Sequence, residues 1–67
     1  MKYVLVLQFK PSSEAQFDEL IDFEEHLTAN LTGFADVDGH DFGSGEMNIF
    51  ILCNEPLNTF REVRKIL

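Results

Sequence analysis

The sequence predicts an α+β fold whose elements follow one another as β-α-β-β-α. Three observations indicate this order: a strand-like run at 3–9, a helical apolar period at 13–31, and two alternating segments joined by Gly-Ser-Gly within 34–54. A right-handed crossover leaves a gap between the first two strands, which the last strand fills. We therefore expect one domain, residues 1–67, with a three-stranded antiparallel sheet in the sequence-strand order 1-3-2 and two helices on one face.

The first strand, Tyr3 to Phe9, reads YVLVLQF. Side chains alternate along a strand, so its odd-numbered residues point to one side, and Val4 and Val6 point to the other. Both sides are apolar, which is typical of a strand covered on both faces. Because two helices cover only one face of a sheet, we expect this strand to form an interface through Tyr3, Leu5, Leu7, Phe9, Val4 and Val6.

The first helix follows Pro11, and its ends are marked by local signals. Ser13 and Gln16 have the spacing of a capping box, and Gly33 marks the end. At about 100° per residue, the helix has an apolar side and an acidic side. The apolar side comprises Phe17, Leu20, Ile21, Leu27 and Leu31. The acidic side comprises Glu14, Asp18, Asp22 and Glu25.

Glu24 is the exception, because its angular position lies within the apolar side of this helix. An unpaired buried carboxylate is very costly, so Glu24 needs either water or a buried partner. Long side chains commonly reach past an apolar rim to water. We therefore expect Glu24 to lie at the edge of the apolar side, with its carboxylate in solvent.

The stretch Phe34 to Asn54 predicts a hairpin with a polar edge strand and an internal apolar strand. Strict alternation puts one set of residues of the first strand on one side: Ala35, Val37 and Gly39. The other side then holds Phe34, Asp36, Asp38, His40 and Phe42. We expect Gly43 and Gly45 to supply the positive φ angles that a tight hairpin turn needs.

The second helix begins near Asn54 and Pro56, which form a helix-start signal. Cations accumulate toward its C-terminal end, where the helix dipole favours them. The helix is expected to bury an apolar side made of Leu57, Phe60, Val63 and Leu67.

The β-α-β-β-α order resembles the ferredoxin-like split β-α-β fold with its last strand missing. In that fold the missing strand would pair along the outer side of the strand at 3–9. The segment DGHDFGSGEMNIFI at 38–51, with MKYVLVLQF before it, resembles a group of small, functionally uncharacterised bacterial proteins. The resemblance implies relatives that continue into a further strand, and it implies no catalytic residue.

Composition limits the classes of partner. Twelve Asp and Glu against five Lys and Arg give a net charge of -7, which disfavours binding to nucleic acid or to an anionic membrane and favours a basic protein partner. Cys53 is the only cysteine, so no intrachain disulfide can form. The N-terminal apolar run is too short for a secretory signal or a membrane span, and a cytoplasmic protein is expected.

The hairpin holds the candidate binding residues, although no catalytic residue and no cofactor is indicated. The run from Asp36 to Asp41 fails the EF-hand pattern. Asp36, Asp38 and His40 lie too far apart along a strand to share one metal ion without a bulge, so no metal site is expected. We expect a ligand to contact residues on both sides of the turn, namely Asp38, His40, Ser44, Glu46 and Asn48.

Three hypotheses for function follow from these patterns. The first is a non-enzymatic interaction or oligomerisation module, a homodimer formed through the sheet face or a strand edge. The second is an acidic inhibitor or immunity-type protein that binds a basic partner through the acidic side of the first helix. The third is a small-ligand-binding or enzymatic domain that uses the hairpin around His40.

Overall fold

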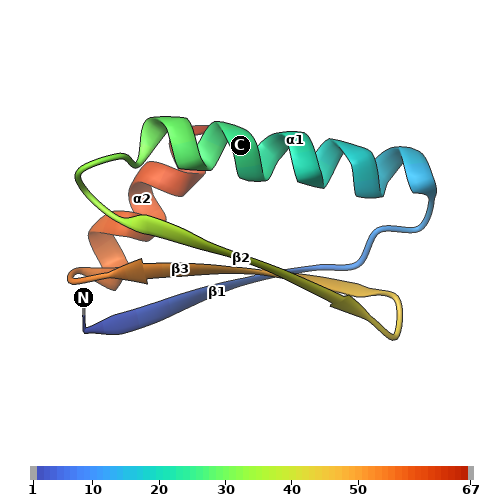
Figure 1. The fold of residues 1–67 in the computed structure, drawn as a ribbon, viewed down its shortest axis with the longest axis horizontal. Helices are drawn as coiled ribbons and strands as arrows, with labels where there is room; N and C mark the ends of the chain where they lie inside the picture. The colour runs from blue at the N-terminus through green and yellow to red at the C-terminus, as the bar shows by residue number, and fades with distance from the viewer. Residues whose placement is uncertain (1, 67) are drawn as a thin grey trace.

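The computed structural model describes residues 2–66 and confirms the expected element order. Strand β1 spans Tyr3–Phe9, helix α1 Glu14–Asn30, strand β2 Asp36–Gly43, strand β3 Glu46–Cys53 and helix α2 Pro56–Ile66. Figure 1 shows the two helices on one side of the sheet. Leu67, which we expected in the apolar side of the second helix, lies outside the described residues.

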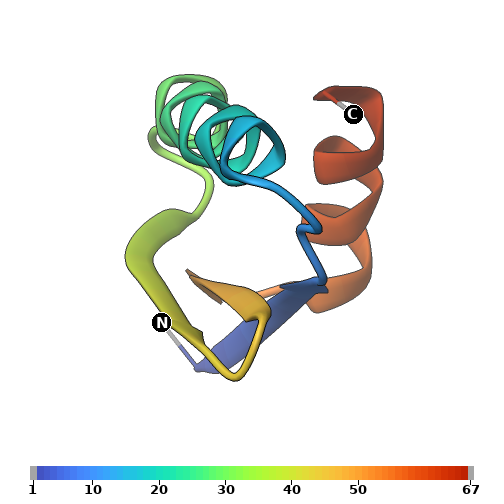
Figure 2. The same cartoon turned by 90° about the vertical axis from the view of Figure 1, so that its right-hand side faces the viewer.

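The three strands form one antiparallel sheet in the predicted order β1-β3-β2. Helix α1 packs toward β2 and helix α2 toward β1, so each helix covers one half of the same face (Figure 2). The opposite face of the sheet, which we call the free face, has none of the described helices against it. The fold is therefore a two-layer arrangement that is compatible with the ferredoxin-like order.

The ends of α1 are set by the residues that the sequence indicates. The Ser13 hydroxyl accepts a hydrogen bond from the backbone N–H of Gln16 at 3.2 Å. The Gln16 side chain accepts in return from the backbone N–H of Ser12 at 2.8 Å, one residue earlier than in a standard capping box. Gly33 has a φ of 82°, which lets the chain turn away from the helix toward β2.

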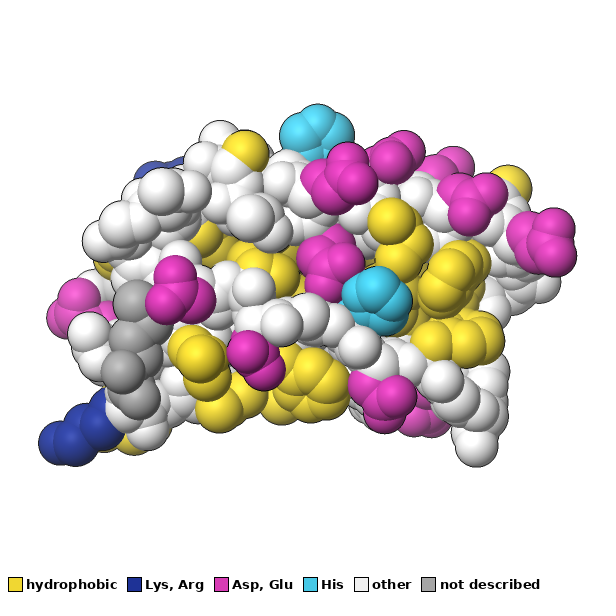
Figure 3. Space-filling model, in the orientation of Figure 1, with side chains coloured by type: hydrophobic (Ala, Val, Ile, Leu, Met, Phe, Trp, Pro, Cys, Tyr) yellow, Lys and Arg dark blue, Asp and Glu magenta, His cyan; other side chains and the backbone are white. Residues whose placement is uncertain are grey.

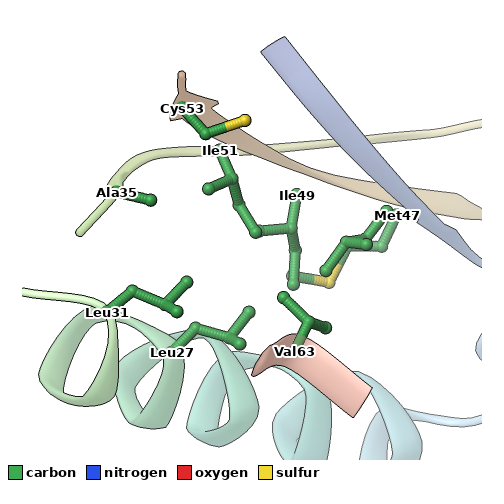
Figure 4. Packing of buried hydrophobic residues seen from close by; sticks show 9 residues of the cluster. Leu27, Leu31, Ala35, Met47, Ile49, Ile51, Cys53 and Val63 are labelled. Atoms are coloured by element: carbon green, nitrogen blue, oxygen red, sulfur yellow. The ribbon is translucent and has the colours of Figure 1, made fainter. Parts of the chain in front are cut away.

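The core lies between β3 and the two helices. Figure 4 shows side chains of β3 pointing toward Leu27 and Leu31 of α1 and Val63 of α2. Alternate residues of β3 are fully buried there, and they are Met47, Ile49, Ile51 and Cys53. The internal position of the apolar strand is therefore confirmed, and it gives both helices a common packing surface.

A bulge in β2 changes the side to which half of that strand points. Val37 pairs with Ile51 and Gly39 pairs with Phe50, so Asp38 is an extra residue in the register. Strict alternation is therefore wrong for this strand. Beyond the bulge His40 pairs with Ile49, whose side chain faces the helices. His40 consequently lies on the same side as Val37, which the alternation had placed opposite it.

The hairpin turn uses a different pair of residues from the one expected. Ser44 has a φ of 54° and Gly45 a φ of 76°, whereas Gly43 ends β2 and pairs with Glu46. Two consecutive positive φ values match the hairpin turn that follows the right-handed twist of the strands. The expected positive φ at Gly43 is wrong, because the loop contains only the two residues after it.

Helix α2 buries a different side from the one expected. Thr59 and Val63 are its buried residues. Leu57 is 77% exposed and Phe60 is 42% exposed. The apolar side predicted from the sequence is therefore only partly correct, because the helix is turned so that Leu57 and Phe60 lie at or beyond the edge of the contact with the sheet.

Candidate functional site

The structure separates the five residues that we expected around the hairpin. His40 faces the helices, Asp38 is the bulge residue, and Ser44 forms the tip of the turn. Glu46 and Asn48 alternate with the buried residues of β3 and therefore point to the free face. These side chains do not converge on one ligand position in this structure.

Glu46 and Asn48 lie instead on the free face, toward the hairpin end of the central strand β3. The Gln8 side-chain amide donates to Glu46 at 2.7 Å, and the Lys10 ammonium lies 3.9 Å from the same carboxylate. Lys10 and Glu46 are both considerably exposed, so this ion pair adds little to stability. The contact places the Lys10 ammonium on the side of the free face.

His40 contacts Glu24 of α1, a residue 16 positions earlier in the chain. His40 Nδ1 lies 2.9 Å from Glu24 Oε1. The His40 side chain is 34% exposed and the Glu24 side chain 15% exposed. We expected the Glu24 carboxylate in solvent, and the structure shows instead a largely buried carboxylate with a partner from β2. The bulge at Asp38 makes this contact possible, because it turns His40 toward the helices.

The Glu24–His40 pair is an oriented carboxylate and imidazole. An ionised carboxylate can only accept, so His40 donates from Nδ1 and its Nε2 is the ring nitrogen left for another contact. Glu24 Oε2 is buried and has no hydrogen-bond partner among the described residues. Across residues 2–66 no group of three or more His, Cys, Asp or Glu side chains could hold a metal ion. The pair can orient one imidazole, but it forms no metal centre.

Aromatic side chains lie beside this pair. The rings of Phe17 on α1 and Phe42 on β2 meet edge to face, with centroids 4.8 Å apart. Figure 3 shows hydrophobic side chains in the crevice between α1 and β2, with a histidine and an acidic side chain at its middle. Strict alternation had placed Phe42 on the side opposite Val37. The bulge puts Phe42 on the same side as Val37, where its ring contacts Phe17 of α1.

The free face of the sheet has an apolar centre. Val4 pairs with Leu52 and Val6 pairs with Phe50, and all four point away from the helices. Val4 is 56% exposed and Val6 is 49% exposed. Asp36 and Asp41 of β2 flank this centre on one side, across Leu52 and Asn48. The free face is thus apolar along β1 and β3 and acidic along β2.

The expected interface strand is divided between the two faces. Leu7 is buried in the core, and Leu5 and Phe9 pack against that core under the helices. Tyr3 is 48% exposed at the start of the strand. Only Val4 and Val6 present their side chains on the free face.

Among residues 2–66, β1 pairs only with β3, so its outer edge has no strand partner there. A groove of about 220 Å³ follows this edge beneath α2. A second cavity of about 390 Å³ continues past the end of the strand, between the two helices. The lining residues of the groove are Val6, Leu7, Gln8, Phe9, Phe60 and Val63.

The cysteine, the second histidine and the acidic side of α1 lie apart from these surfaces. Cys53 is a buried free thiol at the end of β3, and His26 is exposed on α1. The acidic residues Glu14, Asp18, Asp22 and Glu25 are all exposed on α1. No described helix is long and apolar enough to cross a membrane.

Sequence reasoning missed the Glu24–His40 contact, although it had identified each residue as unusual. A signal was present: a carboxylate within an apolar helical side needs a buried partner, and a histidine on a neighbouring strand can provide one. Comparison of the chain with family models, curated proteins and solved structures gave no match. Its function is therefore argued from its own residues.

Proposed function

We propose that this chain is a small non-enzymatic interaction module that forms a homodimer through the free face of its sheet. The observation that carries the proposal is the apolar centre of that face, where Val4 and Val6 are about half exposed beside Phe50 and Leu52. Contiguous exposed apolar surface is typical of interaction sites. The proposal places the chain in the cytoplasm, where the buried thiol of Cys53 stays reduced.

The charges on the free face support one arrangement of the two copies. Lys2 and Lys10 lie at the two ends of β1. Asp36 and Asp41 lie along β2. A two-fold axis parallel to the strands stacks β1 of one copy over β2 of the other, so lysines approach aspartates. An axis across the strands stacks β1 over β1 and brings lysine against lysine. Both arrangements keep the strands of the two sheets aligned, as is common in two-sheet structures, so the charges distinguish them.

The size of the free face limits the affinity. Its strands have seven or eight residues. With a rise of about 3.3 Å per residue and a strand spacing of about 4.8 Å, the face is roughly 25 Å by 14 Å. Such a face is at the small end of specific interfaces, so we expect a Kd in the micromolar range.

Sedimentation equilibrium of wild type and of Val6→Lys tests the dimer. Val6 shares its row of the sheet with Phe50 and Gly39, so no carboxylate of the other copy lies opposite it in the proposed stacking. We expect a concentration-dependent dimer for wild type and a Kd raised at least about thirtyfold by Val6→Lys, because each dimer would bury two unpaired ammonium groups. Leu57→Lys is the matched control, since it makes the same kind of change at an exposed apolar residue on α2. A compact wild-type monomer at every concentration would contradict the proposal.

A double charge reversal tests the arrangement. In the double variant Asp36→Lys with Asp41→Lys, each substitution makes the charge more positive by two, so the net charge changes from -7 to -3. The lower net charge by itself reduces the repulsion between copies. The proposed stacking predicts the opposite result, a dimer weakened about tenfold, because lysine then meets lysine. Asp18→Lys with Asp22→Lys on α1 is the control with the same net charge, and it should not weaken the dimer.

The acidic surface of α1 favours a second candidate, an inhibitor or immunity-type protein for a basic partner. Its four outer carboxylates are exposed, and Figure 3 shows acidic side chains following α1. Such binding would weaken with salt. Retention of a basic protein on the immobilised chain at low salt, lost at high salt and lost in Asp18→Lys with Asp22→Lys, would support this candidate over the first.

A further inference from the structure

We propose that the groove along the outer edge of β1 binds an extended, acidic-apolar peptide strand from another protein, which pairs with β1 beneath α2. This interaction concerns the strand edge rather than the sheet face. It goes beyond the proposed homodimer, and it still holds if the chain does not dimerise through its free face. The unpaired edge and its helical cover support it independently.

The backbone of β1 supplies the first requirement. Its seven residues pair on one side with β3 and have no strand partner on the other side among the described residues. An unpaired edge offers a row of N–H and C=O groups that an extended peptide can satisfy. The other edge of the sheet, β2, is less suitable, because it carries three aspartates and the bulge at Asp38.

Helix α2 supplies the cover for an added strand. Phe60 lines the groove together with Val6 to Phe9 of β1, yet it is 42% exposed. At about 100° per residue, Leu57, Phe60 and Arg64 lie on one flank of α2, and Ile66 lies on the other flank. Ile66 lines the cavity shared with α1, so the flank with Leu57 and Phe60 points away from α1 and past β1. An added strand would place apolar side chains against Leu57 and Phe60.

The charges around the groove define the chemistry of the peptide. Three cations lie near it, since Lys2 and Lys10 adjoin the ends of β1 and Arg64 shares the flank of α2 that carries Phe60. Arg61 lies on the outer side of α2, and Lys65 lies 3.2 Å from Glu62. Nine of the twelve Asp and Glu residues lie elsewhere, six on α1 and three on β2. A chain with a net charge of -7 therefore has three of its five cations near one strand edge, and one of these, Lys10, also lies 3.9 Å from Glu46. Acidic residues at the ends of an otherwise apolar strand are complementary to it.

Binding of short peptides to the full chain tests the proposal. The probe is EVTVTVE, of about seven residues to match the strand, and its controls are KVTVTVK and EVPPTVE. We expect EVTVTVE to bind and to slow hydrogen exchange at amides within Tyr3–Phe9, as seen by NMR. KVTVTVK should bind at least about fivefold more weakly, because its charges oppose those of the groove. EVPPTVE should not bind, because one of its two adjacent prolines must fall where the added ladder needs an N–H donor.

Two variants and one control connect the binding to α2. Arg64→Glu should reduce the preference for EVTVTVE over KVTVTVK, because it replaces one of the cations near the groove by an anion while Lys2 and Lys10 remain. Arg61→Glu makes the same change of charge on the outer side of the helix and should leave the preference intact. Phe60→Ser should weaken EVTVTVE at least about tenfold, because the added strand loses its apolar cover.

Several outcomes would overturn this assignment. One is the absence of EVTVTVE binding at millimolar concentration, and another is equal binding of the proline peptide. Peptide-induced shifts confined to Phe50 and Leu52 would place binding on the free face instead. Slowed exchange within Tyr3–Phe9 that depends only on protein concentration, without peptide, would show that a second copy occupies the edge.

Discussion

The two faces of the sheet are built from the same three strands and differ in what covers them. On β3, Ile49 and Ile51 are fully buried beneath the helices, whereas Phe50 and Leu52 on the free face are only partly buried. On β1, Leu7 is in the core and Val6 is half exposed. Apolar residues therefore alternate onto both faces, but the chain's own helices cover only one. The uncovered apolar centre is what leads us to propose an interaction module.

The largest expected effect is on the covered face. Ile49→Ala should lower the free energy of unfolding by about 2–5 kcal/mol, because it leaves a cavity between β3 and the helices. Phe50→Ala, at the next residue, should lower the unfolding free energy of the monomer much less and should weaken the dimer instead. Urea unfolding at a concentration where wild type is monomeric separates the two effects. Equal losses of monomer stability would contradict the difference between the faces.

An intermediate effect is expected at the border of the covered face, where His40 meets Glu24. His40→Ala should lower the unfolding free energy by about 1–3 kcal/mol, because it leaves a largely buried carboxylate unpaired. His26→Ala, at an exposed histidine on α1, is the control and should have little effect. Glu24→Leu with His40→Ala should recover much of the loss, since an apolar replacement removes the unpaired charge. No recovery would indicate that His40 acts through packing alone.

The smallest effect is expected from a buried hydroxyl on the covered face. Thr59 is 1% exposed, and its Oγ1 has no hydrogen-bond partner among residues 2–66. Thr59→Val keeps the shape and should raise the unfolding free energy by about 1 kcal/mol. The midpoint of thermal unfolding measures this change. A loss of stability would show that the hydroxyl makes a contact the structure does not contain.

Local signals in the sequence predicted the elements and their order. The Ser13 cap, the Gly33 terminator and the apolar alternation of β3 are properties of neighbouring residues, so they can be read without the fold. The topology followed because a right-handed crossover leaves one place for the last strand. The same local rules identified an apolar centre on each face of the sheet.

The predictions that were wrong concern features that depend on residues distant in the sequence. The bulge at Asp38 depends on the register with β3, and it alone turns His40 toward Glu24. The rotation of α2 depends on how the helix packs over β1, and this packing buries Thr59 while leaving Leu57 exposed. Periodicity gives the angles between residues on a helix, but it does not say which side meets the sheet. The candidate site was therefore predicted less well than the fold.

Methyl NMR spectra of the wild-type chain over a dilution series test the central claim most directly, because they report on both faces in one sample. We predict that methyl resonances of Val4, Val6 and Leu52 shift together as the concentration falls through the micromolar range, while those of Ile49 and Ile51 stay fixed. Spectra that do not change with concentration, or shifts shared equally by Ile49 and Ile51, would contradict association through the free face.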